Sequence, residues 1–181
     1  KIHPRLKLIL VPRHVERSQR LADSLAKRLR QTDARNIPMY YRSALNNQSS
    51  PPSDESFILL VDVTGELAAL WGLATVAFVG GSLDGVRGGQ NMLEPAAYGA
   101  AICFGPFTRN FHAEVTALLE ADAAVVIHSG EELTEFVAQC LTDLAFSRTL
   151  GANARNVIDT NQGRTMLTAK RILEFLPAIS S

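Results

Sequence analysis

The chain has 181 residues, of which 46% are hydrophobic and 20% charged, a composition typical of one folded globular domain and not of a disordered segment. Eighteen Lys and Arg residues balance 18 Asp and Glu residues, so the zero net charge gives no general attraction to nucleic acid or to an anionic bilayer. No apolar run approaches the roughly 20 residues that span a membrane. The absence of disulfide or metal-site spacing between Cys103 and Cys140 favours buried roles in a reducing cytoplasm.

Short apolar segments alternate with amphipathic ones along the chain. Strands are predicted at residues 6–11, 37–41, 57–61, 75–79, 101–104 and 124–127. Helices are predicted at residues 16–30, 65–70, 92–98, 111–121, 131–141, 144–158 and 165–176, the last ended by Pro177. This order predicts an α/β fold with a doubly wound parallel sheet, in one domain over residues 1–181.

Other local patterns give further expectations. Leu21, Leu25 and Leu29 recur every four residues and predict the buried face of the first helix. The polar segment at residues 46–53 is expected to be a mobile loop. Trp71 is interpreted as a core residue. Because Lys1 is not preceded by Met or by a signal peptide, we expect further chain before it.

In doubly wound folds, ligands bind at the carboxyl ends of the strands. The first such loop carries Pro12, Arg13 and His14 at the predicted start of a helix. Arginine there is not favoured by the helix dipole, whereas its guanidinium can hold a phosphate or carboxylate by two hydrogen bonds. An anion site and a solvated helix start explain this segment about equally well.

The second loop of this kind is Asp62-Val63-Thr64-Gly65-Glu66. Thr64 is a predicted helix N-cap, and Gly65 would let a ligand approach free backbone N–H groups. Glu66 alone is also what an ordinary helix places in its first turn. This segment therefore supports a site only together with the others.

The third loop is rich in glycine and runs from Gly80 to Ala97. Its glycine pairs permit positive φ and close backbone approach, which makes Gly81, Ser82 and Gly89 secondary candidates for ligand contact. Asn91 and Glu94 lie three residues apart, and so share one face of the first helical turn. That face could bind a ribose or the edge of a base.

Several classes of site are not indicated. The histidines are scattered without metal-ligand spacing, so neither a metal nor another cofactor is expected. No nucleophile elbow, P-loop or G-x-G-x-x-G turn follows the first strand, which argues against a P-loop nucleotidase and an ordinary dinucleotide enzyme.

Taken together, the three loops resemble the C-terminal half of the 3-deoxy-D-manno-octulosonic acid (Kdo) transferases, GT-B glycosyltransferases of family 30. The resemblance covers nearly the whole chain through P-R-H-x-E-R, D-x-x-G-E-L, and F-V-G-G-S-L followed by G-G-x-N-x-L-E-P-A-A. It implies a domain that binds CMP-Kdo, without a metal, for transfer of Kdo to a lipid A precursor in lipopolysaccharide synthesis.

The resemblance also implies which residues contact the CMP moiety. These are Pro12, Arg13, Thr64, Gly65, Glu66, Asn91, Met92, Leu93 and Glu94, with His14, Gly81, Ser82 and Gly89 as secondary candidates. Asn91 and Glu94 are expected at the ribose or base, and Arg13 with helix-start amides at the phosphate or the Kdo carboxylate. The nucleotide would lie across three neighbouring strand ends.

The family's N-terminal acceptor domain has no counterpart in these 181 residues. The resemblance implies that this domain carries the general base and the membrane-associating surface, at the cytoplasmic face of the bacterial inner membrane. No catalytic residue is therefore expected in the chain, which alone should be inactive. The alternatives are a GT-B transferase or epimerase with a UDP-sugar donor, and a non-catalytic α/β binding module.

Overall fold

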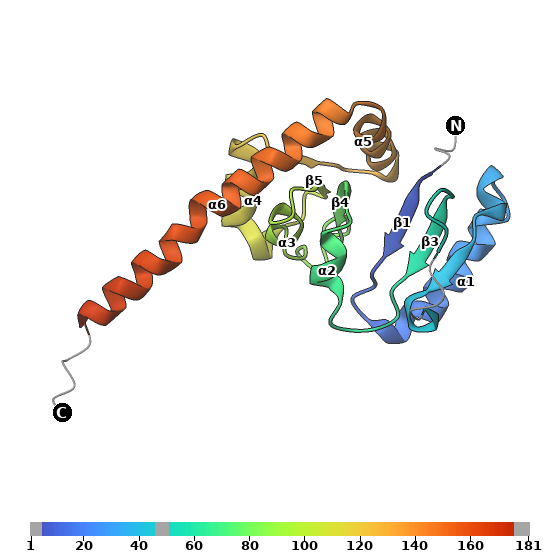
Figure 1. The fold of residues 1–181 in the computed structure, drawn as a ribbon, viewed down its shortest axis with the longest axis horizontal. Coiled ribbons are helices and arrows are strands. Elements are labelled where there is room, and N and C mark those ends of the chain that lie inside the picture. Colours follow the sequence, from blue (N-terminus) through green and yellow to red (C-terminus); the bar gives the residue numbers. More distant parts are fainter. Residues whose placement is uncertain (1–4, 46–50, 176–181) are drawn as a thin grey trace. The chain divides into compact units, whose positions relative to one another are not determined.

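The computed structural model describes residues 5–45 and 51–175. Its chain divides into two compact units, residues 1–67 and residues 68–181, which are described separately below. Each unit contains one three-stranded sheet, and all neighbouring strands in both sheets are parallel (Figure 1). The predicted parallel α/β class is confirmed. The assignment of residues 1–181 to a single domain stays a prediction.

The first unit builds its sheet in the order β1-β3-β2. Its strands are β1 (Lys7–Leu10), β2 (Met39–Tyr41) and β3 (Phe57–Leu60). Leu60, at the end of the central strand, is in register with Leu10 and with Tyr41. The loops after all three strands consequently leave the sheet at the same edge. Only the central strand is largely buried, because β1 and β2 form the edges of this sheet.

Helix α1 (Ser18–Leu29) follows a 3₁₀ turn at Val15–Arg17. The helix is amphipathic, as predicted, but its buried residues are Ser18 and Ala22, whereas Leu21 is 37% exposed. The predicted apolar side is present, with Ala22 buried, Leu25 and Leu29 half-buried, and Leu21 more exposed than expected.

The second unit has the strand order β4-β5-β6 and carries most of the helices. Its strands are β4 (Val76–Val79), β5 (Ala101–Phe104) and β6 (Ala124–Val126). Its helices are α2 (Leu67–Trp71), which begins at the junction of the units, α3 (Leu93–Ala96), α4 (His112–Glu120), α5 (Gly130–Thr142) and α6 (Leu144–Phe175). All six predicted strands are thus present, divided between two sheets.

The core of the second unit lies on both faces of β5, whose four residues are fully buried. Alternate residues point to opposite faces of a strand. Ile102 and Phe104 accordingly pack in one hydrophobic cluster, and Ala101 and Cys103 in another. Burial raises the pKa of Cys103 to about 12, as expected for a core thiol. Helices therefore cover both faces of this sheet.

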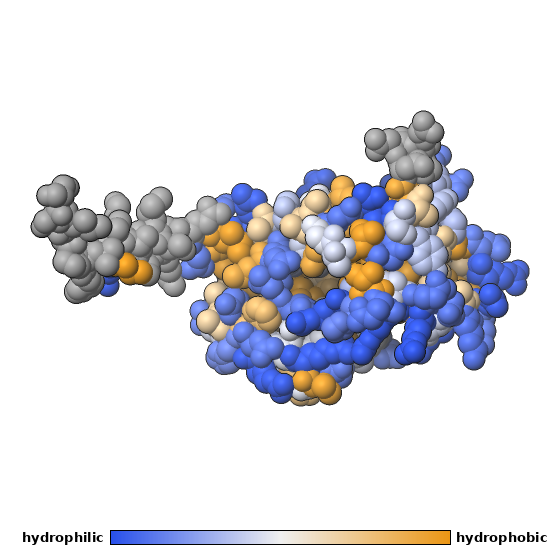
Figure 2. Space-filling view, turned by 90° about the horizontal axis from the view of Figure 1, so that it is seen from below, coloured by the Kyte–Doolittle hydropathy of each residue, from blue (hydrophilic) through white to orange (hydrophobic). Residues whose placement is uncertain are grey.

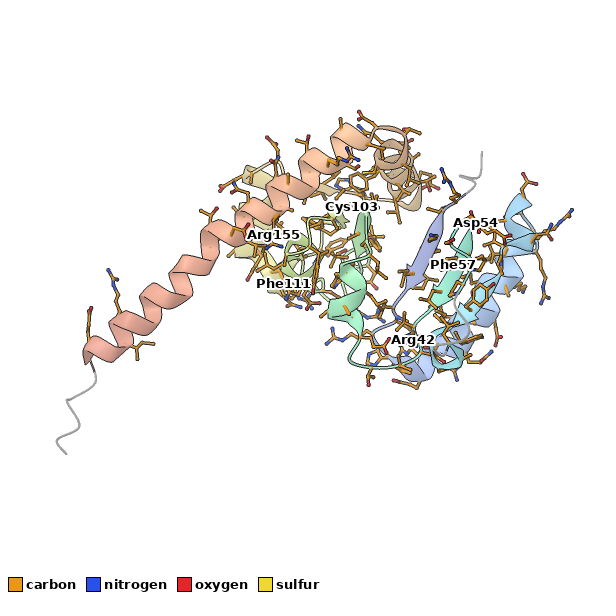
Figure 3. The ribbon with its side chains drawn as sticks, viewed as in Figure 1. Arg42, Asp54, Phe57, Cys103, Phe111 and Arg155 are labelled. Atoms are coloured by element: carbon orange, nitrogen blue, oxygen red, sulfur yellow. The ribbon has the colours of Figure 1, made fainter. Side chains whose placement is uncertain are left out.

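Helix α6 is one continuous helix where two were predicted, at residues 144–158 and 165–176. Thr160 and Asn161 lie within this helix and donate side-chain hydrogen bonds to the carbonyls of Asn156 and Val157. Gly151 lets α6 pack closely, because a Cβ there would lie 2.0 Å from the carbonyl oxygen of Gly99. Figure 3 shows Arg155 on α6, where its guanidinium donates to the carbonyl of Ala97.

Two sequence expectations fall wholly or partly outside the described residues. These are the end of the last helix at Pro177 and the mobile loop, of which residues 46–50 are not described. On the face shown in Figure 2, hydrophilic residues predominate and hydrophobic residues form small patches. Within residues 5–45 and 51–175, no helix combines the length and hydropathy needed to cross a membrane.

Candidate functional site

The first predicted loop, after β1, presents an exposed and unpaired guanidinium. Arg13 is exposed and makes no hydrogen bond or ion pair within the described part of the chain. His14 lies 3.3 Å from the carboxylate of Glu16. Arg13 lies at the helix start, as predicted, because it directly precedes His14, the N-cap of the 3₁₀ turn at Val15–Arg17 that leads into α1. Arg13 can bind an anion as a free cation ahead of the helix.

In the second loop, the carboxylate of Glu66 is already engaged by a guanidinium. Arg42 donates from Nε to Oε2 at 2.7 Å and from Nη2 to Oε1 at 3.0 Å. This two-point geometry is the strongest form of an Arg–carboxylate pair. Sequence reasoning missed Arg42, labelled in Figure 3, although it directly follows β2 and therefore belongs to the same sheet edge.

A second pair of residues, Ser43 and Asp62, holds the same loop nearer to the end of β3. The backbone N–H and the hydroxyl of Ser43 donate to the two carboxylate oxygens of Asp62, at 2.8 and 2.5 Å. Desolvation acts to raise the pKa of Asp62, but the two hydrogen bonds from Ser43 outweigh it and hold that pKa below its ordinary value. Residues 42–43 thus fasten the loop after β3 to the end of β2.

Thr64 and Gly65 lie between Asp62 and Glu66, the two residues that these hydrogen bonds hold. Within the described residues the Thr64 side chain makes no hydrogen bond, so this stretch can offer its backbone groups to a ligand. Gly65 has a φ of +88°, and nothing lies within 4 Å of where its Cβ would be. The glycine is therefore required by its backbone conformation, and the space beside it is open. The N-cap prediction for Thr64 is wrong, because α2 begins at Leu67 and the cap position falls on Glu66.

The glycine-rich loop after β4 is fixed from within by Ser82. The buried hydroxyl of Ser82 donates to the carbonyl of Val79 at 2.7 Å and accepts from the N–H of Gly105 at 2.8 Å. The loop closes where Gly89 donates to the carbonyl of Gly81 at 2.8 Å. Ser82 thus ties the loop after β4 to the loop after β5.

Two residues after β5 hold the outer part of this loop, and sequence reasoning missed both. Arg109 donates to the carbonyls of Gly85 and Val86, at 3.4 and 3.0 Å, and the amide of Asn110 donates to Arg87 at 2.9 Å. Gly88 lies directly beneath them, because a Cβ there would be 2.7 Å from the Arg109 side chain. The sequence signal that could have identified Arg109 and Asn110 is their position after the end of β5.

The helix that follows the loop presents a braced carboxylate. Asn91 accepts from the N–H of Leu93 at 3.0 Å and donates to Oε1 of Glu94 at 3.3 Å. The indole Nε1 of Trp71 donates to Oε2 of Glu94 at 3.2 Å. The interpretation of Trp71 as core is wrong, since it is half-buried and has a polar partner.

The remaining predicted residue, Met92, is fully buried in the core cluster below α3. Its side chain supports the turn, which leaves Asn91, Leu93 and Glu94 as the partly exposed residues of this segment. The structure thus brings the first two loops to one sheet edge in the first unit, and the third loop forms its own cluster in the second unit. The first unit offers a cation and open backbone, and the second unit offers an acidic acceptor; each of these groups is of a kind that binds polar ligands.

No family model matches the chain, but two known proteins similar to it in sequence share one name. It is 33% identical over 175 residues to the 3-deoxy-D-manno-octulosonic acid transferase of Haemophilus influenzae, across 96% of this chain and 37% of that protein. It is 30% identical over 173 residues to the transferase of the same name from Bordetella pertussis, across 96% of this chain and 38% of that protein. The chain therefore spans well under half the length of these relatives.

A solved structure is similar in fold and in sequence. The C-terminal CMP-Kdo binding domain of WaaA from Acinetobacter baumannii superposes with a TM-score of 0.70 at 28% identity. The match covers 83% of this chain and 72% of the solved one. Relatives and fold agree on one family and on one part of it. In both sequence and fold, the chain matches the C-terminal domain of the 3-deoxy-D-manno-octulosonic acid transferases.

Proposed function

We propose that this domain binds CMP-Kdo and presents it for transfer of the Kdo group. The observation that carries the proposal is the match in fold and sequence to a solved domain that binds CMP-Kdo, from Acinetobacter baumannii WaaA. The braced carboxylate of Glu94 and the unpaired guanidinium of Arg13 support it, because both are groups that recognise a nucleotide.

Each segment has its own part in the proposed binding. Arg13 pairs with the phosphate or with the Kdo carboxylate as a free guanidinium. Thr64 and Gly65 contribute backbone groups, since the carboxylate of Glu66 is occupied by Arg42. The carboxylate of Glu94 accepts a hydrogen bond at the ribose or the base, and the amide of Asn91 forms a further hydrogen bond there. Met92 and Ser82 are buried, so in this proposal they do not contact the ligand but stabilise the segments that carry these groups.

The acceptor belongs to the proposal for the complete protein. We propose that a lipid A precursor is held by a preceding domain, which also supplies the general base and associates with the cytoplasmic face of the bacterial inner membrane. The names of the relatives support a Kdo transfer reaction, and the share of those relatives that the chain spans leaves room for such a domain. Neither a UDP-sugar donor nor a non-catalytic binding module is favoured by these comparisons.

The proposal is tested by Kdo transfer with Arg13→Ala and Glu94→Ala variants of the full-length protein. Loss of a charge-assisted contact costs about 1.5–3 kcal/mol, so transfer should fall roughly tenfold to over a hundredfold. Arg20→Ala is the matched control, because Arg20 is exposed on α1 and outside the predicted loops. A fall of only a few fold in the two test variants would favour a binding module instead.

A further inference from the structure

Glu94 is held from two sides by donors that come from different segments. The indole of Trp71, at the end of α2, donates to Oε2 at 3.2 Å, and the amide of Asn91 donates to Oε1 at 3.3 Å. Each carboxylate oxygen thus receives one hydrogen bond inside the second unit. An ionised carboxylate can accept about four in all, so both oxygens retain accepting capacity.

The packing around this pair restricts where the carboxylate can point. Trp71 and Glu94 are both half-buried, so their hydrogen bond is partly shielded from water. Directly after Trp71, Gly72 lies against the ring of Tyr98, because a Cβ at Gly72 would be 3.4 Å from that ring. The end of α2 is therefore seated on the turn that follows α3. This contact holds the indole at a fixed place beside Glu94.

We propose that Trp71 is a positioning residue for nucleotide binding, whose indole N–H orients the Glu94 carboxylate toward a hydrogen-bond donor of the nucleotide. The inference rests on the proposed function, since it concerns the same nucleotide. In this inference the Glu94 carboxylate accepts a hydrogen bond from the nucleotide. In CMP, the group that can donate it is a ribose hydroxyl or the exocyclic amine of cytosine. A tryptophan that only packed would not distinguish between nucleotides that have this donor and nucleotides that lack it.

The test compares three ligands on the full-length protein and on Trp71→Phe, which keeps an aromatic ring and removes the N–H. The ligands are CMP, 2′-deoxy-CMP and UMP, titrated by calorimetry. The donor is identified by the analogue that the wild type binds about tenfold more weakly than CMP and whose disadvantage disappears in Trp71→Phe. In Trp71→Phe, CMP affinity should fall about tenfold, and the preference over that analogue should largely disappear.

Tyr40→Phe is the matched control, because it removes a polar group from an aromatic ring on β2 that packs against Phe57 and makes no hydrogen bond within the described residues. It should retain both the affinity and the preference. The unfolding temperature of each variant shows whether it has folded, and Trp71→Met replaces Trp71→Phe if the latter has not.

The outcomes separate the positioning role from the proposed function. Unchanged affinity and preference in Trp71→Phe would overturn the positioning role. An equal loss for all three ligands would also overturn it, because that result indicates packing alone. A wild-type protein that fails to bind CMP would instead contradict the proposed function, and with it the inference.

Discussion

Arg42 changes the interpretation of a residue that the sequence marked for ligand contact. Both oxygens of Glu66 accept from its guanidinium, so the side chain of Glu66 acts within the protein. The two side chains are about one-third exposed, at 36% and 35%, and water therefore weakens the pair only in part. Its expected effect is to hold the loop that carries Thr64 and Gly65, with the ligand meeting that loop through its backbone.

A double-mutant cycle of Arg42→Ala and Glu66→Ala measures this pair. The coupling free energy should be about 0.5–1.5 kcal/mol, above that of an exposed pair because the geometry is bidentate. Urea unfolding of the wild type, both single variants and the double variant gives the value. Strictly additive losses would show that Arg42 and Glu66 do not stabilise the loop through each other.

The Asp62 carboxylate makes the first unit sensitive to acid. Its pKa is lowered in the folded protein, so the hydrogen bonds from Ser43 stabilise the fold above the ordinary pKa of 3.8. This stabilisation is lost as the pH falls through the lower folded pKa. Asp62→Asn should therefore be less stable than the wild type near neutrality, and the difference should shrink below about pH 4.

Urea unfolding at a series of pH values checks this dependence. Asp54→Asn is the control, because Asp54 is exposed and its carboxylate makes no hydrogen bond within the described residues. A difference between Asp62→Asn and the wild type that stays constant from neutral pH to about pH 2 would contradict the account.

At the scale of elements, the glycine-rich loop gets its shape from the segment after β5. Arg109 and Asn110 bind three consecutive carbonyls of the loop, at residues 85–87, and Ser82 joins the inner ends of both segments. Gly88 has a φ of +76° and no room for a Cβ, whereas Gly80 has neither restriction. The two glycines therefore form a natural test pair.

Gly88→Ala should destabilise the second unit by about 1–3 kcal/mol, from unfavourable φ and from crowding against Arg109 and Asn110. Gly80→Ala should change stability by less than about 0.5 kcal/mol. Chemical unfolding measures both, and CMP binding should weaken in Gly88→Ala alone. Equal stabilities for the two variants would mean that residues after β5 do not hold the loop.

The strands and most helices could be predicted from the sequence because apolar runs and helical periodicity are local signals. Residues 101–104 are predicted and observed as the same strand, in the most buried part of the second unit. The predicted helix break near residue 160 is wrong, since α6 runs through Thr160 and Asn161, whose side chains bond to carbonyls of the same helix. Propensity alone does not reveal this use of polar side chains.

The candidate site was only partly predictable, for a different reason. The residues on the loops themselves are marked by unusual glycine, arginine and acidic patterns in the sequence. Arg42, Trp71 and Arg109 lie 23 or 24 residues from the groups that they hold. Such partners depend on which strands pair and which turns pack together, and these arrangements are tertiary.

At the scale of the whole molecule, the chain matches one part of its longer relatives. It spans 37% and 38% of the two relatives compared above. The groups at its strand ends suit ligand binding, and most of their acidic side chains are engaged with Arg, Ser, Asn or Trp donors. Strand-end groups that suit ligand binding, with acidic side chains that are already hydrogen-bonded, agree with the proposal that this domain binds the donor and that another domain carries out proton transfer.

Calorimetric titration of the full-length protein with CMP, UMP and AMP tests the central claim most directly. If this domain binds the CMP moiety of CMP-Kdo, CMP should bind about tenfold or more tightly than UMP and AMP, a difference of at least about 1.4 kcal/mol. Equal affinities for the three nucleotides, or no binding of CMP, would contradict the account.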